Sequence, residues 1–228
     1  MTEQLSKAGI YHSNDPLQNQ DAIAVDENSR FLTATLADGV SECSEAGTGA
    51  RIVCHAVNDL LLKKGSYFLE LESRYTADFI LRHIQYELNK EAEEAGIELN
   101  EYSSTVASIL LDKKSKKMML FNLGDSLILA AESGKCNILA MPAESCFGCP
   151  STTTENVSAA IYTKVIDASP YNSLLICSDG AWKHMYERDR MKPEVKELLL
   201  NSDCAGLNAF LYAQNCTDDY SYIYINMD

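Results

Sequence analysis

Two long segments of the chain place apolar residues at the spacing of one helical face. In residues 44–64 and 76–95, apolar side chains recur every three or four positions, which predicts two amphipathic helices. Gly65 and Gly96 are the expected stops, and Thr76 is the expected cap of the second helix. Shorter helices are predicted at residues 192–200 and 205–215.

Shorter apolar runs predict strands. They lie at residues 21–25, 31–37, 105–111, 117–123, 127–131, 159–165, 174–178 and 222–226. A turn at residues 115–117 joins two of them, and short connections of this kind indicate antiparallel pairing. Because the strands are grouped apart from the long helices, we expect an α+β fold. They are too many for one small sheet, so two sheets packed face to face with helices outside are expected.

Composition restricts the class of protein. The 228 residues contain no Gly/Ser-rich linker and no repeat, so a single domain over residues 1–228 is expected. Against 19 basic residues stand 33 acidic ones, a net charge of −14, which disfavours nucleic acid and anionic membrane surfaces as partners. The chain shows neither a membrane-spanning run nor a signal-peptide core, so a cytoplasmic location is expected.

The eight cysteines are expected to be free thiols in that compartment. Cys146 and Cys149 form a Cys-x-x-Cys pair, which raises the question of a metal or redox site. Zinc would need a second such pair or nearby histidines, and a thioredoxin-like pair would open a helix. Pro150 and the Ser/Thr run after it favour a loop instead. Redox control through this pair is kept as an alternative.

Acidic residues stand at the ends of the apolar runs. They are Asp21, Asp38, Asp125, Asp179, Asp218 and Asp219. Carboxylates at strand ends can converge where the ends of sheets meet, and such a cluster repels itself unless cations bind. Mg²⁺ and Mn²⁺ favour oxygen ligands of this kind. Any single Asp-Gly is commonly a turn, but so many acids beside apolar runs favour a metal site.

Six short motifs occur in a fixed order along the chain. They are NQD (19–21), ADGVS (37–41), SSTVAS (103–108), NLGDS (122–126), CSDGAW (177–182) and DDYS (218–221). In this order and spacing they resemble the metal-dependent protein phosphatases, the type 2C serine/threonine phosphatases, and in particular their compact bacterial branch. The resemblance runs from residue 10 to 225. It implies a four-layer αββα sandwich with a site for two Mn²⁺ or Mg²⁺ ions between the sheets.

The resemblance also implies a metal-ligand set. Asp38 matches the aspartate that bridges the two metals, and Gly39 offers its carbonyl to one of them. Asp179 matches the aspartate that binds the other metal. Asp218 is preferred to Asp219 as a further ligand, because of its spacing from the serine that ends the DDYS motif.

Further residues are expected around these ligands. By the same resemblance, Asp21 hydrogen-bonds metal-bound water, Asp125 belongs to an optional third metal site, and Asp219 takes the place of an asparagine usual in the family. His12 is a candidate proton donor to the leaving oxygen, with an ordinary loop histidine as the alternative. The implied mechanism is in-line attack by a water that two metals activate, without a covalent enzyme intermediate.

The chain departs from the family pattern at three points. Residues 10–20 contain no arginine to hold the substrate phosphate, so Arg51 and Lys183 are the substitutes to consider. Gln20 stands where many members have glutamate. Lys183 stands where many members have aspartate, so a third metal is expected to bind weakly or not at all.

The sequence therefore predicts a cytoplasmic, metal-dependent phosphatase of phosphoserine and phosphothreonine. Its expected partners are a phosphorylated protein substrate and a cognate serine/threonine kinase in bacterial signalling. The alternative is a phosphatase-fold binding or regulatory module with little turnover, which the missing arginine and Lys183 motivate. Retention of Asp38, Asp179 and Asp218 argues against that alternative.

Overall fold

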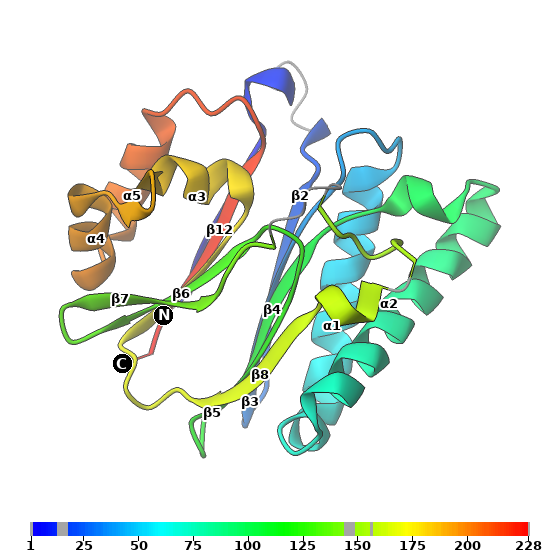
Figure 1. Ribbon diagram of the computed structural model, residues 1–228, viewed down its shortest axis with the longest axis horizontal. Coiled ribbons are helices and arrows are strands. Elements are labelled where there is room, and N and C mark those ends of the chain that lie inside the picture. Colours follow the sequence, from blue (N-terminus) through cyan, green and yellow to red (C-terminus); the bar gives the residue numbers. More distant parts are fainter. Residues whose placement is uncertain (1, 13–17, 144–148, 156, 228) are drawn as a thin grey trace.

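Two antiparallel sheets face each other at the centre of the molecule, and helices cover their outer sides (Figure 1). The computed structural model describes residues 2–12, 18–143, 149–155 and 157–227. The layers run helix, sheet, sheet, helix, so the expected α+β sandwich is confirmed. No helix in the described ranges is long and apolar enough to cross a membrane.

The first sheet has the strand order β2-β3-β4-β5-β8, with every neighbouring pair antiparallel. Its strands are β2 (Asp21–Glu27), β3 (Phe31–Asp38), β4 (Val106–Asp112), β5 (Lys117–Leu123) and β8 (Tyr162–Asp167). Two long helices cover its outer face: α1 (Ala46–Phe68) and α2 (Ser73–Ala95).

The second sheet has the order β1-β12-β9-β6-β7, again antiparallel throughout. Its strands are β1 (Thr2–Lys7), β12 (Tyr220–Asn226), β9 (Ser173–Cys177), β6 (Leu127–Glu132) and β7 (Lys135–Ala140). The outer face carries α3 (Asp179–Met185), α4 (Pro193–Leu200) and α5 (Cys204–Tyr212). The short strands β10 (Tyr186–Glu187) and β11 (Arg190–Met191) form a hairpin after α3, and the 3₁₀ turns are η1 (Ile10–His12), η3 (Leu99–Tyr102) and η4 (Val157–Ala160).

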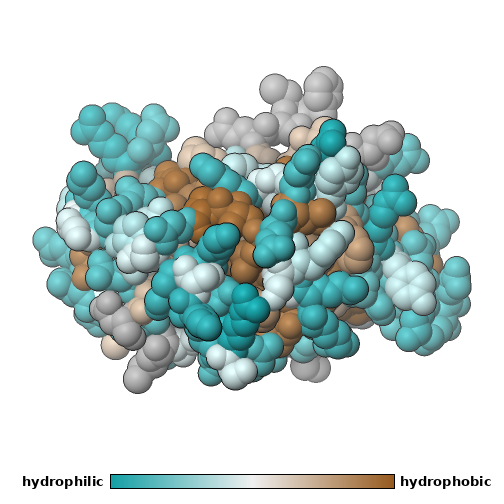
Figure 2. Space-filling view, turned by 90° about the horizontal axis from the view of Figure 1, so that it is seen from below, coloured by the Kyte–Doolittle hydropathy of each residue, from teal (hydrophilic) through white to brown (hydrophobic). Residues whose placement is uncertain are grey.

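Side-chain alternation along the strands builds separate cores on the two faces of each sheet. In β4, Val106 and Leu110 pack under the long helices, whereas Ala107 and Ile109 pack between the sheets. A third core joins the second sheet to its own helices. From the end where the β4–β5 turn lies, apolar side chains show between the two halves (Figure 2). The inter-sheet core reaches the surface there, at a small groove lined in part by Leu32.

One expected helix signal holds in part and one was wrong. α1 is interrupted by a kink at the non-helical Lys64 (φ −121°), next to the expected stop at Gly65, and a second helical stretch continues to Phe68. A Cβ at position 65 would lie 2.9 Å from the Phe31 ring, so this glycine permits close helix–sheet packing. Thr76 does not cap α2, because the helix already begins at Ser73. The Gly96 stop is confirmed, with φ 69°.

The antiparallel pairing expected across the turn at residues 115–117 is confirmed, because β4 and β5 pair there. β5 and β6 are separated only by Gly124, Asp125 and Ser126, yet β5 pairs with β8 and β6 pairs with β7 and β9. The chain therefore crosses from one sheet to the other at residues 124–126. The strands β1 and β7 and the helix α3 were not expected from the sequence.

An ion pair between the half-exposed Arg30 and the buried Asp112 organises the β4–β5 turn. Asp112 accepts hydrogen bonds from the Arg30 guanidinium at 2.8 and 3.0 Å and from the amides of Lys114 and Ser115. The hydrogen bonds from Arg30 outweigh burial and lower the pKa of Asp112 to about 2. A carboxylate of lowered pKa stabilises the fold above its unfolded-state pKa of about 3.9. This contribution disappears as the pH falls towards 2.

We predict that Asp112→Asn lowers the Tm by several degrees at pH 7. A hydrogen bond to a charged group contributes about 1.5–3 kcal/mol, and about 1 kcal/mol shifts the Tm of a domain of this size by about 2–4 °C. The difference from wild type should shrink as the pH is lowered from 4 towards 2, measured by circular dichroism. A difference that stays constant over that range would contradict the ion-pair explanation.

Candidate metal centre

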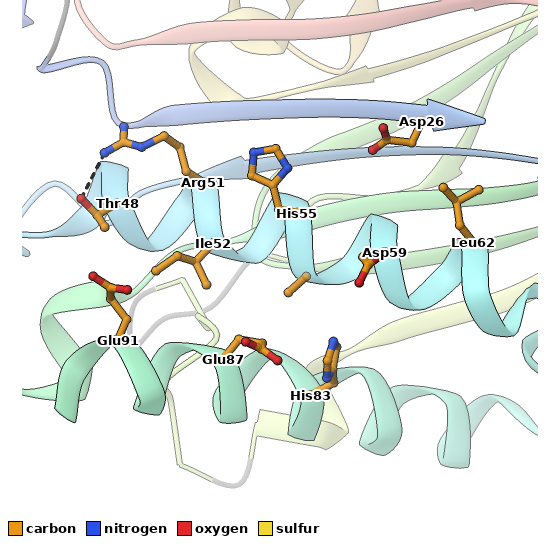
Figure 3. Close-up of a pocket in the computed structure, with 11 residues that line it drawn as sticks. Asp26, Thr48, Arg51, Ile52, His55, Asp59, Leu62, His83, Glu87 and Glu91 are labelled. Atoms are coloured by element: carbon orange, nitrogen blue, oxygen red, sulfur yellow. Dashed lines mark hydrogen bonds between the residues drawn. The ribbon is translucent and has the colours of Figure 1, made fainter. Parts of the chain in front are cut away.

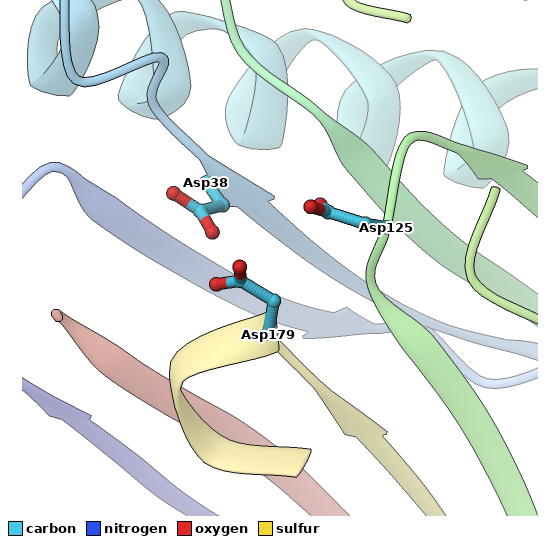
Figure 4. Close-up of side chains that lie close together, drawn as sticks. All are labelled: Asp38, Asp125 and Asp179. Atoms are coloured by element: carbon cyan, nitrogen blue, oxygen red, sulfur yellow. The ribbon is translucent and has the colours of Figure 1, made fainter. Parts of the chain in front are cut away.

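Three carboxylates converge where the ends of the two sheets meet (Figure 4). Asp38 is the last residue of β3, Asp125 lies in the crossing from β5 to β6, and Asp179 is the first residue of α3. One oxygen from each lies within 4.8 Å of the others. Segments distant in sequence, from both sheets, thus supply one compact acidic cluster.

Asp38 is held through its main chain. The Thr105 amide donates to the Asp38 carbonyl at 2.7 Å, and the Asp38 amide donates to the Thr105 hydroxyl at 3.2 Å. Gly39, the next residue, packs closely against α1, because a Cβ there would lie 2.8 Å from Ala46. The backbone on both sides of the carboxylate therefore has little freedom.

The crossing between the sheets fixes Asp125. Gly124 adopts φ 109°, and a Cβ there would lie 2.5 Å from the Thr105 side chain, so only glycine fits before Asp125. The indole Nε1 of Trp182 donates to the Asp125 carbonyl at 2.8 Å. The sequence placed Trp182 in the CSDGAW motif without a role, and the structure shows that it anchors the neighbouring acidic turn.

Asp21 lies beside Asp38 as its cross-strand partner in the β2–β3 register. Its Oδ2 accepts a hydrogen bond from the Ser178 hydroxyl at 2.9 Å, and Ser178 in turn accepts from the Ser221 amide. Burial raises the pKa of Asp21 to about 7, against the hydrogen bonds from the two serines. Sequence reasoning missed Ser178, although it directly precedes Asp179 within a quoted motif.

Burial and charge repulsion together oppose ionisation of the carboxylates in the centre. Burial first, and then the charges of Asp21 and Asp179, raise the pKa of Asp38 well above its usual range. Burial and the charge of Asp179 also raise the pKa of Asp125. Within the described residues, the buried atoms Asp21 Oδ1 and Asp179 Oδ1 have no hydrogen-bond partner. An all-carboxylate donor set with unpaired oxygens fits hard divalent cations such as Mg²⁺ and Mn²⁺.

Lys183 brings a positive charge to the cluster. It lies one helical turn after Asp179 on α3, with its Nζ 2.5 Å from Asp179 Oδ2. Burial opposes its charge, but Asp179, then Asp125 and Asp218, outweigh burial and raise the pKa of the ammonium. Lys183 therefore carries its positive charge beside Asp179, with its side chain more than half exposed.

The adjacent aspartates 218 and 219 differ in their surroundings. Asp219 is buried and accepts from the amides of Gly9 at 2.9 Å and Gln20 at 2.7 Å, and from His12 Nδ1 at 3.0 Å. It joins the segment before β2 to the start of β12. Asp218 lies at the rim of the centre. Partial burial and then the nearby charge of Asp179 raise the pKa of Asp218. Asp218 is not one of the three converging residues, so its role as a ligand stays a prediction.

Arg51 lies in a different place. It lines a groove of about 740 Å³ between α1 and α2, with His55 and His83 nearby (Figure 3). Its guanidinium donates to Thr48 Oγ1, on the same helix, at 3.0 Å. Of the two candidate phosphate-binding cations, the structure thus brings only Lys183 to the carboxylates.

The Cys-x-x-Cys pair is only partly described. Cys146 lies outside the described residues, so its pairing with Cys149 is not addressed. Burial and the neighbouring Asp125 raise the pKa of the Cys149 thiol to about 12. Since the thiolate is the reactive form, the raised pKa lowers the thiolate fraction of Cys149, although the residue itself is exposed.

Solved structures share this architecture. Serine/threonine phosphatase Stp1 from Staphylococcus aureus superposes with TM-score 0.73 at 15% identity, covering 100% of this chain and 94% of that chain. A bacterial serine phosphatase superposes with TM-score 0.73 at 14% identity, covering 100% and 97%. RsbX, solved in complex with magnesium, superposes with TM-score 0.57 at 15% identity, covering 98% and 92%. At such identities the likeness shows the fold alone.

Sequence comparison assigns the family. No curated protein matches the chain. The family model of protein phosphatase 2C, a metal-dependent family, matches residues 8–213, a range that contains five of the six motifs and ends before DDYS at 218–221. Because this match covers most of the sequence, the protein belongs to the protein phosphatase 2C family.

Proposed function

We propose that this chain is a metal-dependent phosphatase of phosphoserine and phosphothreonine in proteins. The observation that carries the proposal is the convergence of Asp38, Asp125 and Asp179 at the junction of two sheets in a chain of this family. In this proposal residues 1–228 act as one domain. A phosphorylated protein substrate, a kinase that phosphorylates it and a cytoplasmic setting belong to the same proposal.

The proposed ligand set for two Mn²⁺ or Mg²⁺ ions is Asp38, Asp179, Asp218 and the carbonyl of Gly39. When bound, such ions lower the pKa of a water molecule and neutralise charge on phosphoryl oxygens. Asp38 and Asp179 already converge, so this part of the proposed ligand set is preorganised. Asp218 lies outside the converging cluster, and Lys183 contacts Asp179, so both side chains would have to shift when the ions bind.

In this proposal, side chains around the metal ligands bind water, donate a proton to the leaving oxygen and orient the substrate phosphate. Asp21 has its Oδ2 held by Ser178, and its buried Oδ1 has no partner among the described residues, so Oδ1 can accept a hydrogen bond from water in the centre. His12 is engaged by Asp219 through Nδ1, so Nε2 is the ring atom left for exchange with a leaving oxygen. Lys183 is the candidate for contact with the substrate phosphate, because its ammonium already lies at the cluster.

The second candidate function is a binding or regulatory module of the same fold. The Lys183–Asp179 ion pair favours it, since the ammonium occupies one carboxylate oxygen of the centre. The two functions differ in turnover, and the following variants separate them.

We predict that Asp38→Asn and Asp179→Asn each lower phosphatase activity by at least about 100-fold, a loss that even partners of metal ligands can cause. Activity would be measured with p-nitrophenyl phosphate and a phosphothreonine peptide in the presence of Mn²⁺. Without divalent cations, Asp38→Asn should keep or raise the Tm, because one repelling charge is removed.

The control is the rise in Tm that Mn²⁺ produces in the wild type through binding to the folded state. Asp38→Asn should lose this rise. Full activity in either variant would refute the proposed function. Wild type that gains Tm with Mn²⁺ but hydrolyses neither substrate would favour the regulatory module.

We predict further that Lys183 limits the number of bound cations. Lys183→Gln removes a positive charge next to Asp179, so Mn²⁺ titration by calorimetry should show an added site or at least about 10-fold tighter binding. Two unit charges 4 Å apart interact by about 4 kcal/mol at an effective dielectric constant of 20. Lys183→Arg keeps the charge and should titrate like wild type. Identical titrations of the Gln and Arg variants would contradict this role.

A further inference from the structure

A second cavity opens directly beside the candidate metal centre. Its volume is about 770 Å³, and both Asp125 and Lys183 line it. The cavity extends away from the carboxylate cluster and has two walls. One wall is β7 with the segment that follows it, and the other is α3 with the β10–β11 hairpin. The cavity is thus continuous with the proposed catalytic centre.

The walls of this groove are apolar and already ordered. Trp182 packs edge-on against Tyr186, with ring centroids 6.3 Å apart and an interplanar angle of 86°. The Trp182 indole also holds the Asp125 carbonyl, so one side chain fixes both the groove and the acidic turn. On the opposite wall, Ile138 is 42% exposed and Met141 is 65% exposed. Apolar side chains left uncovered beside a polar centre mark a binding surface.

A cationic residue stands at the rim. Arg188 occupies the turn between β10 and β11, with φ 55°, and lines the groove together with Asp189. Arg188 forms no ion pair with any described residue. The other charged residues of the lining are Lys183, Asp125 and Asp189, and Lys183 is paired with Asp179. Arg188 is therefore the cation at the rim that can pair with an acidic side chain of whatever binds there.

We propose that this groove binds the part of the phosphoprotein that flanks the phosphorylated residue. An apolar side chain of the substrate packs between Trp182 and Met141, and an acidic side chain lies at Arg188. The proposal rests on the proposed phosphatase function and adds which residues the enzyme prefers beside the phosphorylated one. A peptide fits better than a small phosphate ester, because an ester bound at the carboxylates would leave the apolar walls uncovered.

The test uses phosphothreonine peptides with Leu or Ser, and separately Glu or Lys, at each position near the phosphothreonine. For wild type we expect kcat/KM to be about 10-fold higher with Leu at one flanking position, which is within the discrimination an apolar pocket provides. In the double variant Ile138→Ser, Met141→Ser, the ratio of kcat/KM for the Leu peptide to kcat/KM for the Ser peptide should fall close to one. Arg188→Glu should reverse the preference for Glu over Lys.

The controls separate the groove from the centre. p-Nitrophenyl phosphate has no peptide to contact the groove, so its hydrolysis measures the activity of the metal centre alone. This rate should be unchanged in the groove variants. Tyr86 on α2 is 65% exposed, as Met141 is, but it lies outside the groove. Tyr86→Ser should therefore leave the Leu/Ser and Glu/Lys ratios of kcat/KM at their wild-type values. Trp182 is the sole tryptophan of the chain, so its fluorescence reports peptide binding without turnover.

Each outcome bears on one of the two proposals. Hydrolysis of p-nitrophenyl phosphate with no peptide preference and no change in Trp182 emission would overturn the groove proposal and leave the phosphatase proposal standing. Absence of any hydrolysis would refute the phosphatase proposal, while a Leu-dependent change in emission would still support the groove. Loss of a dimer in the Ile138→Ser, Met141→Ser variant, seen by sedimentation, would identify a second copy as the occupant and overturn the proposal.

Discussion

Mutual repulsion among partly buried carboxylates is the constraint around which this end of the molecule is organised. Asp38, Asp125 and Asp179 lie within a few ångströms of one another, and their removal from water raises the cost of ionising them together. A flexible chain would relieve that cost by moving the groups apart. The backbone prevents it with short, inflexible connections, such as the φ 109° turn at Gly124 and the paired hydrogen bonds between Asp38 and Thr105.

The sandwich makes this convergence possible because both sheets contribute to it. β3 ends at Asp38 in one sheet and β9 leads into Asp179 in the other, while the crossing at Asp125 joins them. Asp219 ties the segment before β2 to the start of β12 through three hydrogen-bond donors. Packing between the sheets therefore sets the geometry of the centre, and the inter-sheet core is part of the functional apparatus.

Charge compensation within the protein distinguishes this centre. Lys183 contacts Asp179 from the next turn of α3, so part of the positive charge that the carboxylates require comes from the chain itself. The same helix carries Trp182, which connects the acidic turn to the adjacent apolar groove. One short helix thus links the charge of the centre to the surface proposed to select its substrate.

The sequence alone determined the two long helices, most strands, the α+β class and the family, because periodicity and motif order are local properties of the chain. It also identified the acids that converge. It could not show that β5 and β6 enter different sheets, since a connection of Gly124, Asp125 and Ser126 has the length of a hairpin. It missed α3, which is too short for a helical period, and hence the contact of Lys183 with Asp179. Those features depend on which strands pair and which faces pack, and only the tertiary structure decides that.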